Sequence, residues 1–249
     1  MTEQPSVPAE ATGASPATED APDLVTRRGD IGRRLRTNRL EAFSDGVFAI
    51  AITLLVLEIG TSDVAAGGLW QAVADQWPSY LAYLVSFASI GAAWLAHSAM
   101  TEFIDRVDAT FLRINLLLLL VVAFLPYPTR LLAEHIGSDQ DERVAVTLYG
   151  LTLLVTSLLI SILWRWAARE RLIQPGYDDE DVRLLTQRLT PGIGGYVVLV
   201  LVGQWRPLVA VVGFLVIAFF FLIPFPLRER RADRERSQRR RDSRRDTAR

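Results

Sequence analysis

The chain has 249 residues, of which 50% are hydrophobic, 22% are charged and none is cysteine. The absence of cysteine excludes a disulfide framework, a thiolate metal site and a cysteine nucleophile. Only two histidines, His97 and His135, are present, so we expect neither a metal centre nor another cofactor. Charged residues are confined to the ends and to short gaps, a distribution typical of a membrane protein.

The two ends of the chain have different compositions. Residues 1–32 are rich in Pro, Ala, Thr, Ser and acidic residues and have no sustained apolar period, which predicts a disordered cytosolic tail. The other end, from residue 228, holds eleven arginines against five acidic residues. We expect residues 229–249 to form a second cytosolic tail that anchors the topology. The expected partners are the lipid bilayer, monovalent cations and further copies of the chain, not nucleic acid.

Between the tails, residues 33–228 contain six candidate membrane spans, so the predicted fold is an all-α integral membrane protein. Five uncharged windows approach or reach the roughly 20 residues of a spanning helix: Gln76–Ala96, Ile114–Thr129, Val144–Trp164, Leu189–Trp205 and Pro207–Leu227. Before them, the segment Leu40–Ile59 has spanning length only if it accepts four polar residues inside it or at its edges: Glu41, Ser44, Asp45 and Glu58.

The arginines of the loops test this count of six, because they accumulate on the cytoplasmic side of short connections. With both termini inside, 24 of the 27 arginines fall on the inner side, and only Arg130, Arg143 and Arg206 fall outside. An odd number of spans would place the arginine-rich end on the wrong side. We therefore expect six spans, two cytosolic termini and a location in the cell membrane.

The first span carries an aspartate, and an ionisable residue within a span indicates a function or a structural polar contact. At about 100° per residue, Ile50, Leu54 and Leu57 form an apolar stripe, with Thr53 on its flank. Asp45 points roughly 140° away from this stripe. We therefore expect Asp45 to face other helices of its own bundle.

The topology supplies partners for this aspartate. The first span enters from the cytosol, the second returns to it and the third enters again, so Asp45, Trp94, His97 and Asn115 should lie at a similar inner depth. A hydrogen-bonded cluster at this depth would satisfy Asp45 and fix the first helix. The alternative for His97 is an isolated, satisfied histidine.

The same residues carry a family resemblance. Arg39, followed by Phe43-Ser44-Asp45 and then by Gly46-Val47-Phe48-Ala49-Ile50-Ala51-Ile52-Thr53, resembles the signature of the transmembrane protein 175 family. This family comprises endosomal and lysosomal potassium channels and their prokaryotic relatives. The resemblance extends through Trp94-Leu95-Ala96-His97 and through the leucine run that begins at Asn115.

The resemblance implies a function for these positions. The first helices would line a pore, Ile50 would form its narrowest ring, Thr53 would contribute to selectivity, and Leu57 would add a second apolar ring beyond Leu54. Arg39, Ser44 and Asp45 would pack with Trp94, His97 and Asn115. Animal members carry two six-helix repeats and dimerise, whereas this chain shows the motif once. The resemblance therefore implies a homotetramer with four first helices around one pore.

A channel built in this way has no backbone selectivity filter, because the chain lacks a T-V-G-Y-G loop. An apolar ring excludes ions by dewetting when narrow and passes them partly hydrated when wider. We expect passive flux with a modest preference for K⁺ over Na⁺, with only transient K⁺ as a bound metal. Glu58 and Asp63 could concentrate cations at the outer mouth, although exposed acidic residues are also ordinary solvated helix ends.

Other functions stay open from the sequence alone. The stripe is also compatible with a bundle core, and Thr53 could simply bond back to a carbonyl one turn earlier. A secondary transporter would need paired repeats or broken helices, and the chain shows no internal duplication. A proton-permeable channel or a membrane enzyme would use Asp45 and His97, the sole candidate acid–base pair. No nucleophile or metal set accompanies that pair, so we do not expect an enzyme.

Overall fold

The computed structural model describes residues 21–59, 68–137, 141–175, 177, 179–189 and 191–223, with the backbone alone for residues 21–36, 179, 188–189 and 191. The elements run in the order α1 (Ala21–Leu54), the 3₁₀ turn η1 (Leu55–Glu58), α2 (Leu69–Asp75), α3 (Trp77–Thr101), α4 (Ala109–Phe124), α5 (Pro126–His135), α6 (Asp141–Arg169), α7 (Asp179–Leu189), α8 (Pro191–Gly203) and α9 (Pro207–Leu222). Over these residues the only extended pairing is an isolated bridge between Ile104 and Ile173.

In the part of the chain that the structure describes, five stretches of helix are long and apolar enough to cross a membrane: Thr37–Glu58, Trp77–Thr101, Ala109–His135, Asp141–Arg169 and Glu180–Gly203. The shorter apolar helix α9 follows as the sixth. Each of the six windows expected from the sequence coincides with one of these stretches, so the prediction of an all-α membrane protein is confirmed.

Helix α1 is longer than its apolar window. It begins at Ala21, inside the range expected to be a tail, and continues without a break to Leu54. The sequence is compatible with this early start, because Pro22 falls in the first turn, where its missing N–H breaks no helical hydrogen bond. At the other end the helix tightens into η1, which finishes at Glu58.

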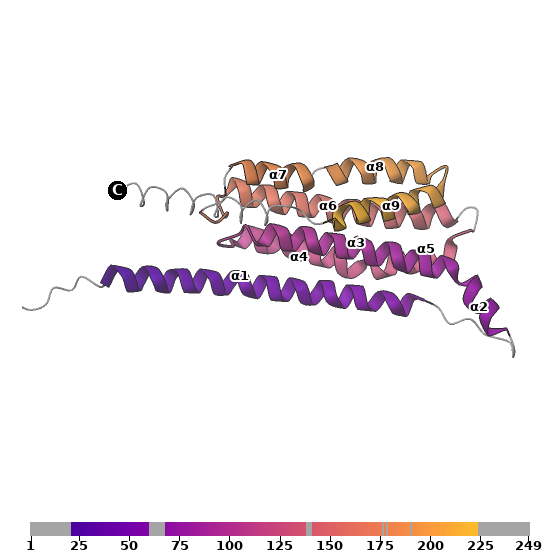
Figure 1. Ribbon diagram of the computed structural model, residues 1–249, viewed down its shortest axis with the longest axis horizontal. Helices are drawn as coiled ribbons and strands as arrows, with labels where there is room; N and C mark the ends of the chain where they lie inside the picture. The colour runs from indigo at the N-terminus through magenta and orange to yellow at the C-terminus, as the bar shows by residue number, and fades with distance from the viewer. Residues whose placement is uncertain are drawn as a thin grey trace, which may run out of the picture.

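The helices form successive layers (Figure 1). Helix α1 lies along one edge and contacts α3 and α4, which in turn contact α9 and α6, and α8 covers the far side. We call the end of the bundle where α3 ends and α4 begins the proximal end, and the end with η1 and α2 the distal end. Because α1 has neighbours on one side only, just 28% of its spanning window is buried, against 50% for α6.

The centre of the bundle is packed closely around α6. Tyr149 and Trp164 are among its largest fully buried side chains. On the same helix, Gly150 allows α8 and α9 to approach α6 closely. A Cβ at this position would lie 2.7 Å from side-chain atoms of Val200 in α8 and Phe214 in α9. Contacts this short are not tolerated, so glycine at position 150 lets α8 and α9 dock onto α6.

A row of hydroxyl groups crosses the interior of the bundle. Thr129 donates to the carbonyl of Leu125 at 2.9 Å, and its oxygen lies 2.8 Å from the hydroxyl of Ser86. The Ser86 hydroxyl donates to Tyr149 at 3.1 Å, and Tyr149 donates to Ser89 at 3.5 Å. Each buried hydroxyl thus has a partner, as burial in an apolar bundle requires.

Backbone pairing closes the proximal end. The N–H of Asp105 donates to the carbonyl of Leu172 at 2.9 Å, and the N–H of Gln174 donates to the carbonyl of Phe103 at 2.8 Å. The hydroxyl of Thr37 in α1 donates to the carbonyl of Asp105 at 3.4 Å. The connection between α3 and α4 is therefore tied both to the segment after α6 and to α1.

Candidate functional site

Helix α1 has a buried face and an open face. The buried positions follow one another at intervals of three or four residues and continue into η1, which places them on one side of the helix: Thr37, Leu40, Ser44, Phe48 and Ala51 in α1, and Leu55 in η1. These side chains pack against α3, α4 and α5. Their spacing fixes which way the remaining side chains of α1 point.

The apolar stripe expected from the sequence lies on the open face. Ile50 is 61% exposed, Leu54 is 40% exposed and Leu57, in η1, is 73% exposed. None of the three belongs to the core of its own subunit, so the alternative of a stripe that fills the bundle interior does not hold for this chain. Within one chain the stripe faces outward, toward lipid, another subunit or a pathway.

Thr53 lies on the same open face. Its hydroxyl donates a hydrogen bond of 2.9 Å to the carbonyl of Ile50. This back-bond uses the proton of the hydroxyl and leaves the lone pairs of its oxygen without an intrahelical donor. A threonine held in this way presents an oxygen acceptor to the space beyond the helix.

Ser44, Asn115 and His97 form a hydrogen-bonded row inside the bundle. The Nδ2 of Asn115 donates to Ser44 Oγ at 3.0 Å, and the Oδ1 of Asn115 lies 2.9 Å from His97 Nε2. Because an amide oxygen can only accept, His97 Nε2 must carry the proton in this arrangement. All three side chains are buried, so the row joins α1 to α4 and α4 to α3 away from water.

Asp45 has a different partner. Its Oδ1 accepts a hydrogen bond of 2.8 Å from Trp94 Nε1 in α3. Within the single chain Asp45 stays exposed, because the neighbouring Ser44 occupies the buried position. Residues 44 and 45 point about 100° apart, so their two hydrogen bonds hold α1 against both rotation and sliding. We call Ser44, Asp45, Trp94, His97 and Asn115 the polar anchor.

The structure does not bring every expected residue to this cluster. Arg39 is exposed, and over the described residues no hydrogen bond or ion pair ties it to the polar anchor. Glu58 ends η1 near Arg130, with which it interacts electrostatically, while Arg130 pairs with Glu134 at 2.8 Å. Asp63 lies outside the described residues. At the distal end, therefore, the positive charge of Arg130 partly offsets the negative charge of Glu58.

The candidate acid–base pair is not joined by a hydrogen bond. His97 bonds to Asn115 and Asp45 bonds to Trp94. No group of three or more His, Cys, Asp or Glu side chains in the described part of the chain is placed to hold a metal ion. In its described part the site is a helix fixed by hydrogen bonds, with an apolar outward face and the hydroxyl of Thr53 on that face.

Sequence reasoning missed two features. One is the row of hydroxyls through Ser86 and Tyr149, and the other is a small cavity beside Ser89 and Tyr196. The available signal was the recurrence of hydroxyl residues inside otherwise apolar windows. That signal identifies the residues but not their partners, since each partner sits on a different helix.

Comparison with known proteins gives consistent relatives. The family model described as endosomal/lysosomal potassium channel TMEM175 matches residues 39–126, which include the whole polar anchor. A potassium channel of Streptomyces collinus is 43% identical over 162 residues, which is 64% of this chain and 79% of the relative. An endosomal/lysosomal proton channel TMEM175 of Gallus gallus is 30% identical over 142 residues, or 53% of this chain and 28% of the longer animal protein.

A solved structure supports the same grouping. The crystal structure of a lysosomal potassium-selective channel TMEM175 homolog from Chamaesiphon minutus matches with a TM-score of 0.69 and 39% sequence identity. The match covers 76% of this chain and 97% of that chain, so it extends over nearly the whole of the solved protein. The chain therefore belongs to the TMEM175 family.

Proposed function

We propose that this chain is one subunit of a potassium-permeable cation channel. The main supporting observation is that α1 turns Ile50 and Thr53 outward, and η1 turns Leu57 outward, while hydrogen bonds of Ser44 and Asp45 hold α1 to α4 and α3. An exposed apolar stripe alone would suit lipid equally well. A stripe held in one orientation by one buried and one exposed hydrogen bond, next to a hydroxyl oxygen, fits a pore better. The names of the bacterial relatives support potassium as the ion.

A pore requires several subunits, because one outward-facing helix encloses nothing. Four copies of α1 around a common axis would give rings of Ile50, Leu54 and Leu57 and a ring of Thr53 oxygens. The partner of the open face is then a second copy of this chain. The chain spans only 28% of the animal relative, which fits a larger number of shorter subunits.

The proposed mechanism is passive. The Ile50 ring offers no oxygen to replace water around an ion, so it blocks flux when narrow. When the ring widens, the larger and more weakly hydrated K⁺ loses water at less cost than Na⁺. The outward oxygen of Thr53 offsets part of that loss. The resulting preference for K⁺ is modest, since side chains and not a rigid carbonyl cage provide it.

The proposed topology places the proximal end and both termini in the cytosol and the channel in the cell membrane. Arg106, Arg113, Arg165, Arg169 and Arg171 flank the connections at the proximal end, as the distribution of positive charge in membrane proteins favours. The channel domain then covers residues 33–228, with cytosolic tails at 1–32 and 229–249. Glu58 and Asp63 belong to the outer mouth.

Proton permeation is the second candidate, because the animal relative is named a proton channel. A route through Asp45 and His97 would need water between them, since each is bonded to another partner. The Asp45→Asn variant, reconstituted in liposomes that enclose a pH-sensitive dye, separates proton permeation from K⁺ permeation. Loss of proton entry with retained K⁺ flux would assign the proton path to Asp45.

Liposome flux of the purified protein tests the main proposal. We expect faster uptake of K⁺ than of Na⁺, and Ile50→Asn should raise basal leakage and reduce the discrimination between the ions. Val216→Asn in α9 is the matched control, because Val216 has nearly the same exposure, 62%, but lies on another helix. Equal leakage in both variants, or a monomer by native mass spectrometry, would contradict the proposal.

A further inference from the structure

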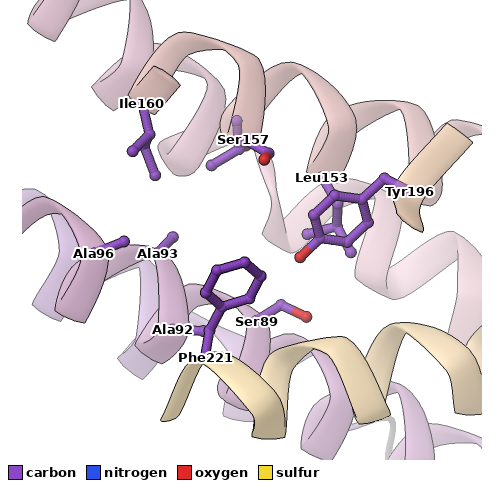
Figure 2. A pocket seen from close by; sticks show the side chains of 10 residues that line it. Ser89, Ala92, Ala93, Ala96, Leu153, Ser157, Ile160, Tyr196 and Phe221 are labelled. Carbon is purple, nitrogen blue, oxygen red and sulfur yellow. The ribbon is translucent and has the colours of Figure 1, made fainter. Parts of the chain in front are cut away.

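A cavity of about 40 Å³ lies between α3, α6, α8 and α9, and Figure 2 shows it from close by. A single buried water needs about 10–15 Å³ on this measure, so the cavity has room for more than one. No residue of α1 lines it. The cavity is therefore separate from the proposed pore and lies within one subunit.

Tyr196 points its hydroxyl into this cavity. The side chain is only 7% exposed, and Figure 2 shows the phenol reaching from α8 toward the middle of the cavity. In the part of the chain that the structure describes, no hydrogen bond reaches this hydroxyl, although Tyr149, Thr129 and Ser86 all have partners. The hydroxyl opens onto the cavity and is not sealed in the core, so a molecule bound there can exchange a hydrogen bond with it.

Other polar groups border the same space. Ser89 on α3 is buried, and among the described residues its one hydrogen bond with another hydroxyl is the long one of 3.5 Å from Tyr149. Ser157 on α6 has no hydrogen bond among the described residues and also borders the cavity. The hydroxyls of Ser89, Ser157 and Tyr196 come from three different helices, and each can both donate and accept.

The rest of the wall is apolar except for Thr156, whose hydroxyl donates to the carbonyl of Thr152 at 2.8 Å. Ala92, Ala96, Ile160 and Phe221 are among the lining residues, and no charged residue is. A charged ligand would lose its hydration without gaining a counter-charge, which excludes ions from this site. A neutral molecule with one polar group and a short apolar body would match both parts of the wall.

The cavity also reaches the surface of the chain. Ala93, Ala96, Ser157 and Phe221 at its rim are partly exposed, whereas Ser89 and Ile160 deeper inside are buried. The rim residues lie on the apolar helices α3, α6 and α9, so in a bundle that spans a membrane the opening would lie at the depth of the bilayer. A molecule dissolved in the bilayer could therefore enter with its polar group first and leave its apolar end toward the lipid.

We propose that this cavity is a binding site for a small neutral amphiphile that carries one hydroxyl group, of the class of medium-chain alcohols. The hydroxyl of the ligand exchanges hydrogen bonds with Tyr196 and Ser89, and its first carbons lie against the alanines of α3. Ala93 and Ala96 share a turn of α3 with Trp94 and His97 of the polar anchor. A ligand here would thus touch the helix segment that holds α1.

Photolabelling with 3-azioctanol, a photoreactive alcohol, tests the site in the full-length protein in liposomes. We expect adducts on the segments of α3, α6 and α9 that line the cavity, and competition by 1-octanol but not by octane. Tyr196→Phe keeps the shape of the side chain and should lower labelling of these segments about fivefold, the effect of one lost hydrogen bond. Adducts are counted only on α3, α6 and α9, because Tyr196→Phe also removes a reactive phenol from α8 and would lower labelling there for that reason alone.

Tyr127→Phe is the matched control, because Tyr127 is exposed and lies outside the cavity, and it should leave labelling unchanged. Ala96→Leu fills the cavity and should abolish labelling on the same segments while adducts on lipid-facing positions persist. The proposal is overturned if adducts spread evenly over lipid-facing residues, if Tyr196→Phe labels like the unaltered protein, or if octane competes as well as 1-octanol. Labelling does not depend on ion conduction, so this result is independent of the proposed channel function.

Discussion

The indole N–H of Trp94 in α3 donates a hydrogen bond of 2.8 Å to the carboxylate of Asp45 in α1. The residue before Asp45, Ser44, accepts from Asn115 of α4. Two consecutive residues of one helix are therefore bound to two different helices. The proposed pore helix cannot turn about its own axis without breaking at least one of these bonds, which predicts that α1 moves together with α3 and α4.

Removing the Trp94–Asp45 bond should weaken this coupling. We expect Trp94→Phe and Asp45→Asn each to lower the thermal stability of the protein in detergent, with a coupling free energy of about 1 kcal/mol between them in a double-mutant cycle. We expect a smaller coupling free energy than for a fully buried charged pair because Asp45 is exposed within the single chain. Additive effects of the two substitutions would mean that the bond contributes nothing.

Replacing Asn115 should have a larger effect than replacing Ser44. Asn115→Leu leaves both His97 and Ser44 without a partner in a buried site, at a cost of about 2–4 kcal/mol. Ser44→Ala removes one of the two bonds and should cost about 1 kcal/mol. The free energies of unfolding of the two variants in detergent, measured by tryptophan fluorescence, test this order. A Ser44→Ala variant as unstable as Asn115→Leu would show that the row does not act through Asn115.

Thr53 should affect selectivity more than stability. Thr53→Val keeps the shape of the side chain and removes the oxygen, so we expect the ratio of K⁺ to Na⁺ flux to fall toward one in the liposome assay. Thr53→Ser keeps the oxygen and should retain most of the ratio. The stability of both variants should stay close to that of the unaltered protein, because Thr53 bonds only within its own helix. An unchanged ratio in Thr53→Val would remove Thr53 from the pathway.

Two glycines offer a matched test of helix packing. At Gly150 an added Cβ would meet Val200 and Phe214 at 2.7 Å, whereas at Gly194 it would meet nothing within 4 Å. We expect Gly150→Ala to destabilise the protein by about 1–3 kcal/mol and Gly194→Ala to be neutral or slightly stabilising. Melting temperatures in detergent compare them directly. Equal melting temperatures would show that α8 and α9 can shift away from α6 without loss.

Much of this arrangement could be predicted from the sequence. Hydropathy located the helices, and a consistent in–out topology placed Asp45, Trp94, His97 and Asn115 at one depth, where the structure joins them in two hydrogen-bonded groups. Depth alone could not say which residue bonds to which. The partner of Asp45 depends on how α1 is turned against α3, and that turn is set by the fit of Phe48 and Leu55 into the core.

Other features had no local signal. The early start of α1 at Ala21 depends on a helix that continues through an arginine-rich sequence, where hydropathy falls and Gly29 and Gly32 lower helix propensity, so neither signal located it. The cavity beside Tyr196 arises where four helices meet, and no single window contains its lining. Arg39 belongs to the sequence signature, yet it stands apart from the polar anchor within one chain.

The 3₁₀ turn η1 changes the shape of the distal part of the stripe. In an α-helix Leu57 would stand about 60° round from Leu54 and about 4.5 Å farther along the axis. In 3₁₀ geometry residues three apart are eclipsed and about 6 Å apart along the axis, so the two leucines form one straight ridge. Four such ridges around one axis would extend a single constriction into a longer hydrophobic segment of the pore. An ion would then cross a longer dehydrated segment before it reached water on the outer side.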